Sequence, residues 1–185
     1  IDLSEVAESA EIEFISVNGD LREAILWHGD LRTGAPTTAT LLPSNSTLSS
    51  SLILHPSSFI PPTSPMSYLY EPDPAILRAR LVQPLAAQMG AQQIDESIAF
   101  LTSDQLINTP FAKRFHVEDW FPFQLKRLRT YLRERHVGQL TIKKRGSPLD
   151  VEQLRRQLRL KGKSSRILIL THVQQQPVAI ICYQS

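Results

Sequence analysis

The sequence predicts an α+β protein built from two parts, a small antiparallel β-rich module and a larger mixed α/β domain. Residues 11–28 alternate polar and apolar side chains around an Asn-Gly pair, which is typical of a β-hairpin with one buried face. Residues 44–67 are rich in Ser, Thr and Pro and separate the two parts. Residues 121–138 and 150–162 carry leucines at helical spacing, which predicts two amphipathic helices in the second part.

The first module is predicted to span residues 1–43. Asn18-Gly19 favours a tight turn between its first two strands. Residues 44–67 are expected to form a linker or a mobile connection rather than packed structure, because Ser, Thr and Pro dominate them. The predicted strands of the module lie at 11–18, 21–28 and 37–43.

The second domain is predicted to span residues 68–185 and to begin with a helix at 71–90. Asp73 is suited to cap this helix, and Gly90 is suited to end it in the left-handed conformation. Pro84 interrupts a regular helix, so we expect a kink or a break near residue 80. The remaining predicted elements are strands at 97–104 and 113–120, a helix at 121–138, a strand at 139–144, a helix at 150–162 and a hairpin across 166–183.

The ends of the last two predicted helices follow from caps and glycines. In the first of them, Phe121 starts the inner apolar stripe and Gly138 closes the helix. In the second, Asp150 is the expected N-cap and Gln153 is its capping-box partner. Gly162 is the expected terminator of this second helix.

Charge is divided unevenly along the chain, although the net charge is only +2. Residues 1–110 hold 4 Lys and Arg against 13 Asp and Glu, whereas residues 111–166 hold 16 against 5. This concentration of cations favours a polyanionic partner. Because Lys and Arg contact phosphates without regard to base sequence, a nucleic-acid backbone is the first candidate. An acidic protein surface is the alternative.

The candidate RNA contacts lie on the two basic helices and on the strand between them. Side chains alternate along a strand, so Lys143 and Arg145 are expected to point to one face and Lys144 to the other. All three are therefore not expected to share one ligand. For each single cation, the alternative is a solvated side chain on an outer surface. The candidate set is Lys143, Lys144 and Arg145 on the strand, Lys126, Arg129 and Arg133 on the first helix, and Arg155, Arg156 and Arg159 on the second.

The sequence contains no recognisable catalytic machinery and no cofactor motif. It lacks GxG and nucleophile-elbow patterns, and its five histidines lack the spacing of a helical metal pair. Cys182 is the single cysteine, cannot form a cysteine zinc site and is expected to be a small buried hydrophobe. We therefore predict no catalytic, cofactor-binding or metal-binding residue in this chain. The alternative is an independent enzyme that uses His116, Glu118 and Asp119, which would have to converge in a cleft.

Composition restricts the remaining classes of protein. With 42% apolar and 21% charged residues, the chain has the composition of an ordinary globular protein. No run of 18 apolar residues occurs, so we predict no membrane span. A single cysteine fits a reducing compartment and predicts a cytoplasmic location. The first residue is not Met, which suggests a piece of a longer protein.

Several segments, taken in order, resemble a known family. EIEFISVNGDLREAILWHG (11–29) and ATLLP (39–43) resemble its small ferredoxin-like module. The segments that follow resemble the THUMP-like domain at the C-terminus of a family of bacterial class I S-adenosylmethionine-dependent methyltransferases. Pro84, the connection at 44–67 and the Gly-free turn at Gln174–Gln176 depart from the family pattern. The THUMP-like segments are YLYEPDPAILRARL (68–81), AFLTSD (99–104), PFQLKRLRTYLRER (122–135), IKKRG (142–146) and LRRQLRLKG (154–162).

The resemblance implies a Rossmann-like methyltransferase domain N-terminal to Ile1, which would bind S-adenosylmethionine and carry the catalytic residues. This chain would then be an inactive substrate-recognition region that docks structured RNA on its basic face. The RNA role rests on analogy with true THUMP domains, which help RNA-modifying enzymes to hold their RNA. The alternative is a scaffold whose basic face packs on the catalytic domain or on another acidic protein surface, without touching RNA.

Overall fold

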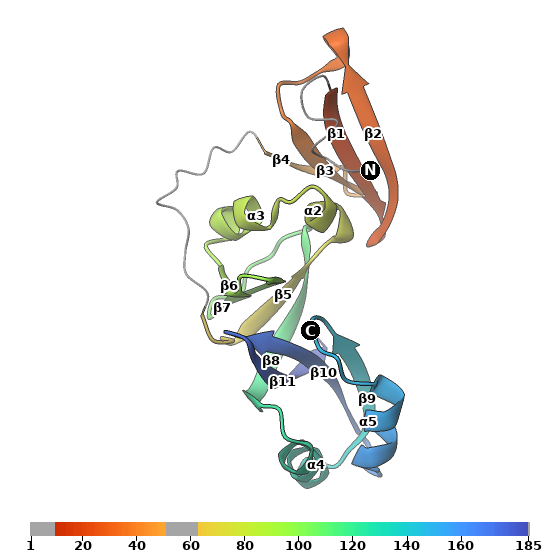
Figure 1. Cartoon of the computed structure of the whole chain (residues 1–185), viewed down its shortest axis with the longest axis vertical. Helices are drawn as coiled ribbons and strands as arrows, with labels where there is room; N and C mark the ends of the chain where they lie inside the picture. The colour runs from red at the N-terminus through yellow and green to blue at the C-terminus, as the bar shows by residue number, and fades with distance from the viewer. Residues whose placement is uncertain (1–9, 51–62, 185) are drawn as a thin grey trace. The chain divides into compact units, whose positions relative to one another are not determined.

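The computed structural model describes residues 10–50 and 63–184, which form two compact units (Figure 1). The N-terminal unit contains residues 10–50, 71–92 and 107–113, and the C-terminal unit contains the other described residues. Each unit is therefore discontinuous in sequence. These divisions differ from the predicted boundaries at residues 43 and 68, because residues 71–92 pack with the N-terminal sheet.

The N-terminal unit is built on a four-stranded sheet in the order β2-β1-β3-β4. The predicted hairpin is confirmed: β1 and β2 are antiparallel, and Asn18 and Gly19 form the turn with φ of 53° and 84°. β3 runs parallel to β1, a pairing that strand patterns alone do not specify. The strands are β1 (Ala10–Val17), β2 (Asp20–His28), β3 (Thr37–Leu42) and β4 (Ser46–Ser49), and a short 3₁₀ turn, η1 (Gly29–Leu31), follows β2.

The predicted linker at 44–67 is wrong at its start, because β4 pairs there with β3. Leu48 is the one apolar residue of β4 and is only 4% exposed. Its neighbours are Ser and Thr, so composition concealed a strand that tertiary packing stabilises. Residues 51–62 of the predicted linker lie outside the described residues.

The predicted break in the first helix is confirmed. α2 (Pro74–Arg78) and α3 (Val82–Met89) are separate helices, and Arg80 between them has a left-handed φ of 58°. Pro84 is the third residue of α3, where its missing N–H breaks no intrahelical hydrogen bond. The Asp73 carboxylate caps α2 by accepting from the Ala75 N–H at 2.8 Å, and Gly90 ends α3 with φ of 61°.

The C-terminal unit contains most of a seven-stranded sheet in the order β6-β7-β5-β8-β11-β10-β9. Its antiparallel pairs include β5 with β7, β8 with β11 and β10 with β11, whereas β9 and β10 are parallel. β5 and β6 are too short for the sequence pattern to have revealed them. The strands are β5 (Tyr68–Pro72), β6 (Gln92–Asp95), β7 (Ile98–Ser103), β8 (Ala112–Pro122), β9 (Val137–Lys144), β10 (Ser164–Val173) and β11 (Gln176–Gln184).

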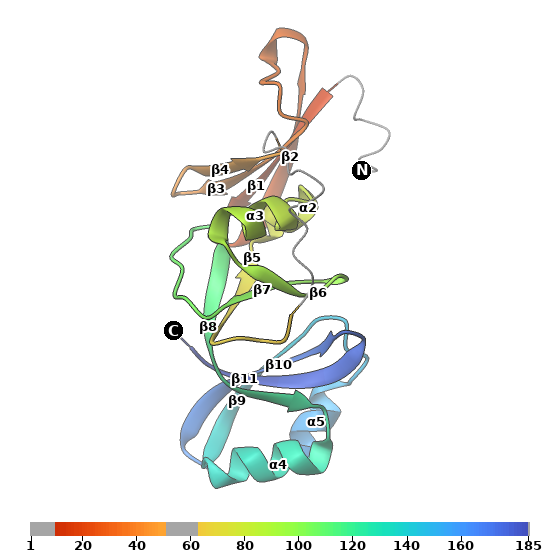
Figure 2. The same ribbon diagram turned by 90° about the vertical axis from the view of Figure 1, so that its left-hand side faces the viewer.

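Two helices, α4 (Leu125–Glu134) and α5 (Val151–Leu158), lie on one face of this sheet (Figure 2). Their buried residues share a core with one face of the sheet, and a second core fills the opposite face. Helix amphipathicity was therefore predicted correctly, since the leucine stripes face the sheet. The first core includes Leu128, Leu132, Leu154, Leu158, Leu168 and Leu170, and the second includes Phe100, Phe115, Ile167, Ile169 and Ile180.

Three predicted helix limits are wrong. Phe121 belongs to β8, where it pairs with Ala179 and is 2% exposed, so it does not start α4. Gly138 lies inside β9 rather than at a helix end. α5 has its predicted cap, with the Asp150 carboxylate accepting from the Gln153 N–H at 2.6 Å. It ends, however, at Arg159, three residues before Gly162.

The C-terminal hairpin has a defined register although its turn lacks Gly. Val173 pairs with Gln176, so Gln174 and Gln175 form a two-residue turn with φ of 48° and 65°. Two left-handed residues in succession match the twist of an antiparallel hairpin. Residues 167–171 of β10 and 178–182 of β11 are buried on both faces of the sheet, so burial alone does not select the register and the two-residue turn fixes it.

Gly138 and Gly162 allow two backbone segments to come into direct contact. A Cβ at Gly138 would lie 1.8 Å from the Gly162 carbonyl oxygen, and a Cβ at Gly162 would lie 1.7 Å from the His136 carbonyl oxygen. The Gly162 N–H donates to the Val137 carbonyl at 3.3 Å in the same region. The two glycines therefore hold the start of β9 against the segment between α5 and β10.

Replacing either glycine by Ala is expected to destabilise the C-terminal unit by about 3 kcal/mol or more, because backbone rather than a flexible side chain occupies the space. Gly90→Ala is the comparison, since nothing lies within 4 Å of its Cβ position and only its positive φ opposes the change. We expect it to cost about 1–2 kcal/mol. Denaturant unfolding measures both values. A Gly138→Ala protein no less stable than Gly90→Ala would contradict the close approach of the two segments.

Candidate nucleic-acid interface

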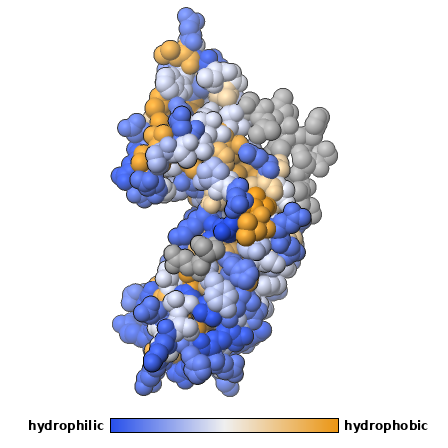
Figure 3. Space-filling view, turned by 180° about the vertical axis from the view of Figure 1, so that it is seen from behind, coloured by the Kyte–Doolittle hydropathy of each residue, from blue (hydrophilic) through white to orange (hydrophobic). Residues whose placement is uncertain are grey.

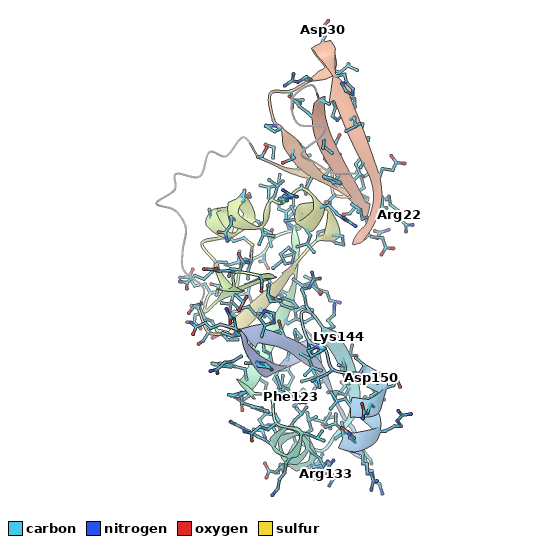
Figure 4. The ribbon with its side chains drawn as sticks, in the orientation of Figure 1. Arg22, Asp30, Phe123, Arg133, Lys144 and Asp150 are labelled. Atoms are coloured by element: carbon cyan, nitrogen blue, oxygen red, sulfur yellow. The ribbon has the colours of Figure 1, made fainter. Side chains whose placement is uncertain are left out.

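The outer surfaces of α4 and α5 carry six of the nine predicted RNA contacts, and we call these six the α4–α5 basic face. All except Arg129, which is half-buried, are exposed. Figure 3 shows a mostly hydrophilic surface on the C-terminal unit, and Figure 4 labels Arg133 of this set. The six residues are Lys126, Arg129 and Arg133 on α4, and Arg155, Arg156 and Arg159, with Arg159 at the C-cap of α5.

Few acids neutralise this face. Arg155 pairs with Glu152 across 3.6 Å, and its guanidinium also donates to the Leu140 carbonyl at 2.7 Å. The Arg133 guanidinium donates to the Leu158 carbonyl at 3.5 Å. In residues 10–50 and 63–184, no carboxylate forms an ion pair with the other members of the face. The face therefore presents positive charge to solvent.

The three remaining predicted contacts separate as the strand alternation predicted. Lys143 lies over the Phe115 ring at 5.5 Å and Arg145 over the Phe100 ring at 5.8 Å, both on the face opposite the helices. The Lys144 ammonium instead donates to the Leu149 carbonyl at 3.1 Å, next to the start of α5. Lys144 thus lies with the helices, while Lys143 and Arg145 do not.

Two basic residues outside the predicted set are held by structural contacts. The Glu118 carboxylate pairs with Arg135 at 3.0 Å and with Arg166 at 2.5 Å. Arg135 also lies 3.5 Å from the centre of the Tyr131 ring, a cation–π contact with α4. Burial acts to raise the pKa of Glu118, but the hydrogen bonds and charges of the two arginines outweigh it, so the pKa is lowered.

The predicted alternative catalytic set does not converge. Glu118 is neutralised by its two arginines, and the Asp119 carboxylate accepts from the Trp120 N–H at 2.7 Å. The exposed His116 ring lies between Tyr68 and Tyr183, with ring centroids 5.4 and 5.8 Å away. Each of the three residues has separate partners, and no described hydrogen bond joins one of them to another, so the structure gives no support to a shared catalytic arrangement.

Ser97, His172 and Asp95 come together without the arrangement of a hydrolase. The Ser97 hydroxyl donates to the Asp95 carboxylate at 2.7 Å, and His172 Nε2 lies 2.9 Å from the same hydroxyl. In a catalytic triad the carboxylate holds the other ring nitrogen, whereas here Asp95 is 3.5 Å from Nε2 itself. The Asp95 carboxylate also accepts from the Gln175 N–H at 3.3 Å, so this cluster joins two turns.

Cys182 is buried, and burial, with the charge of Glu118, raises the pKa of its thiol to about 12. It is therefore a poor nucleophile at neutral pH, as the sequence predicted.

The described part of the chain contains no group of three or more His, Cys, Asp or Glu side chains that could hold a metal ion. Among the same residues, no helix has the length and apolar character needed to cross a bilayer.

The chain is therefore an α+β protein in which two basic helices, α4 and α5, cover one face of the C-terminal sheet. Residues 112–184 match the family model described as THUMP domain-like. Two relatives, from Mycobacterium tuberculosis strains CDC 1551 / Oshkosh and ATCC 25618 / H37Rv, are both named uncharacterized S-adenosylmethionine-dependent methyltransferases. Each is 33% identical to this chain over 178 residues, which cover 94% of the chain and 48% of the relative. Residues 112–184 are therefore THUMP-like, and the chain as a whole is similar to about half of each of these methyltransferases.

A solved structure shares the fold. It is a candidate methyltransferase from Porphyromonas gingivalis W83, matched with a TM-score of 0.74 and 21% identity over 99% of this chain and 47% of that protein. The chain thus spans about half the length of the relatives that it matches.

One parallel β-α-β unit, β9-α5-β10, does not fit S-adenosylmethionine, although the relatives are named for it. The parallel unit β9-α5-β10 has only one glycine, Gly146, in the loop before its helix, and His172 lies beside that glycine. The Asp150 carboxylate already caps the N-terminus of α5, and Figure 4 labels this residue below Lys144. A glycine-rich loop that could cradle an anionic cofactor at a helix N-terminus is therefore missing from this unit.

Glu118→Gln is expected to destabilise the protein by about 2 kcal/mol at pH 7. This is less than for a fully buried pair, because Arg135 is 38% exposed and solvent screens its charge. Since the folded pKa of Glu118 is lowered, its contribution is present above the unfolded pKa of about 4.3 and disappears as the pH falls through the folded value.

Unfolding measured between pH 7 and pH 3 should therefore show a shallower acid loss of stability for Glu118→Gln than for the unaltered protein. Glu152→Gln is the control, because Glu152 is 78% exposed, and its effect should stay within about 0.5 kcal/mol. Equal stabilities of Glu118→Gln and the unaltered protein across this pH range would rule out the ion-pair contribution.

Proposed function

We propose that this chain is the substrate-recognition region of a longer S-adenosylmethionine-dependent methyltransferase, and that it binds structured RNA on the α4–α5 basic face. The observation that carries this proposal is the excess of positive charge on two adjacent helices, where only Arg155 of the six basic side chains forms an ion pair among the described residues. Similarity to methyltransferases and the THUMP domain-like match support it. In this proposal the cofactor and the catalytic residues belong to the other half of the protein, which is a cytoplasmic enzyme.

Contact with RNA would come mainly from guanidinium and ammonium groups at phosphates. Five of the six cations on the two helices are exposed, as expected for binding that recognises backbone and shape. Lys144 extends the face toward the end of β9. We assign Lys143 and Arg145 a smaller role, because they are half-buried on the opposite side of the sheet.

The proposal predicts a steep dependence of RNA affinity on salt, measured by filter binding or fluorescence anisotropy with a structured RNA. Lys126→Ala combined with Arg156→Ala should weaken binding and reduce the slope of log affinity against log salt by about 2, because each cation neutralises one phosphate. The matched control is Arg22→Ala combined with Arg78→Ala, which removes two exposed cations from the N-terminal unit.

Two further results bear on the proposal. Lys143→Ala combined with Arg145→Ala should change the slope by less than the helix pair does. An RNA affinity that does not change with salt, or equal losses of affinity from the helix pair and the control pair, would contradict RNA binding by the basic face. The first of these outcomes would favour the scaffold alternative, in which the basic face packs on an acidic protein surface.

A further inference from the structure

A hollow of about 520 Å³ opens where the C-terminal ends of α4 and α5 meet. We propose that it binds a phosphate group, either a terminal phosphate or a backbone phosphodiester of the RNA. This inference rests on the proposed function and assigns one ligand group to one place on the basic face. The lining residues, all in the C-terminal unit, are Arg133, His136, Val137, Arg159, Lys161 and Gly162.

The charges around the hollow favour an anion. Arg133, Arg159 and Lys161 are permanent cations, and no described carboxylate pairs with them. Each helix C-terminus contributes about −0.5 charge, so the ends of α4 and α5 together offset roughly one of the three positive charges. About two positive charges remain, which suits a phosphate monoester or diester.

The backbone at the hollow also indicates that its side chains are needed. His136 and Arg159 both line it and both have left-handed backbone, with φ of 53° and 49°. Glycine is the usual residue in this conformation at a helix end, because any Cβ is strained there. The chain thus has an imidazole and a guanidinium where glycine would be more stable, a pattern found at functional sites.

The base of the hollow is held in place before any ligand binds. The close approach of Gly138 and Gly162 joins the segments that follow the two helices. The Ser164 hydroxyl and N–H both donate to the His136 carbonyl, at 2.8 and 3.0 Å. These bonds fix the His136 carbonyl against Ser164, the first residue of β10. A fixed backbone lowers the entropic cost of placing cations around an anion.

The first test uses inorganic phosphate, titrated into the 185-residue protein at constant ionic strength with chloride as the balancing ion. Calorimetry or NMR shifts report binding. Arg159→Gly should weaken binding about tenfold or more, because a charge-assisted hydrogen bond is removed. The melting temperature should not fall, since glycine relieves the left-handed strain.

Arg156→Gln is the matched control, because it removes the same charge from an exposed site on α5 that does not line the hollow. It should change phosphate binding by about twofold at most. Equal losses of affinity from Arg159→Gly and Arg156→Gln would mean diffuse charge rather than a site and would overturn the inference. Absence of saturable phosphate binding by the unaltered protein would overturn it as well.

The second test identifies the source of the phosphate, with one RNA oligonucleotide prepared with a 5′-phosphate, a 3′-phosphate or neither. If a terminal phosphate occupies the hollow, Arg159→Gly combined with Lys161→Gln removes the preference for one phosphorylated end. If a backbone phosphodiester occupies it, the same variant weakens all three RNAs equally and lowers the salt slope. Both results support the inference.

Failure of this inference can be distinguished from failure of the proposed function. If the double variant binds every RNA as the unaltered protein does, with the same salt slope, the hollow is not the phosphate site and RNA binding by the rest of the face stands. If the unaltered protein binds inorganic phosphate through Arg159 but binds no RNA, the proposed function fails and the hollow remains a phosphate site.

Discussion

The arrangement of the C-terminal unit depends on the close approach of Gly138 to Gly162. Two backbone segments come so near to each other there that no side chain fits between them. One segment leaves α4 and the other leaves α5, so this approach brings the ends of both helices together on the same face of the sheet. The leucine stripes bury the inner sides of the helices, and the cations on their outer sides become one surface. A basic face with a hollow at its edge follows from this geometry.

Electrostatic pairing divides the many cations of this unit into two groups. Glu118 is held by Arg135 and Arg166, and these two arginines join β8, β10 and the end of α4. Arg127 lies 4.3 Å over the Phe121 ring and covers the core. These arginines stabilise the fold. Those on the outer sides of α4 and α5 have few acidic partners, so their charge remains for a ligand.

Similarity to methyltransferases covers almost the whole chain and about half of each relative. The parts that carry the similarity include both units, yet the positive charge is concentrated in the second. The proposed division of labour, with recognition in this chain and chemistry in the other half of a longer protein, would account for this similarity without a cofactor loop or a reactive nucleophile in the described residues. The same proposal would explain why charge, rather than a catalytic motif, was the informative signal in this sequence.

The sequence by itself determined the features that depend on neighbours within about four residues. These are the amphipathic helices, the caps at Asp73 and Asp150, the Asn18-Gly19 hairpin, the break before α3 and the alternation of Lys144 with its neighbours. Tertiary structure alone decided the parallel pairing of β3, the short strands β4 to β6 and the place of Phe121 in a strand. It also decided the meeting of His136 with Lys161 at the hollow. Periodicity and capping are local, whereas strand partners and close backbone approaches join residues far apart in the chain, and no local pattern records them.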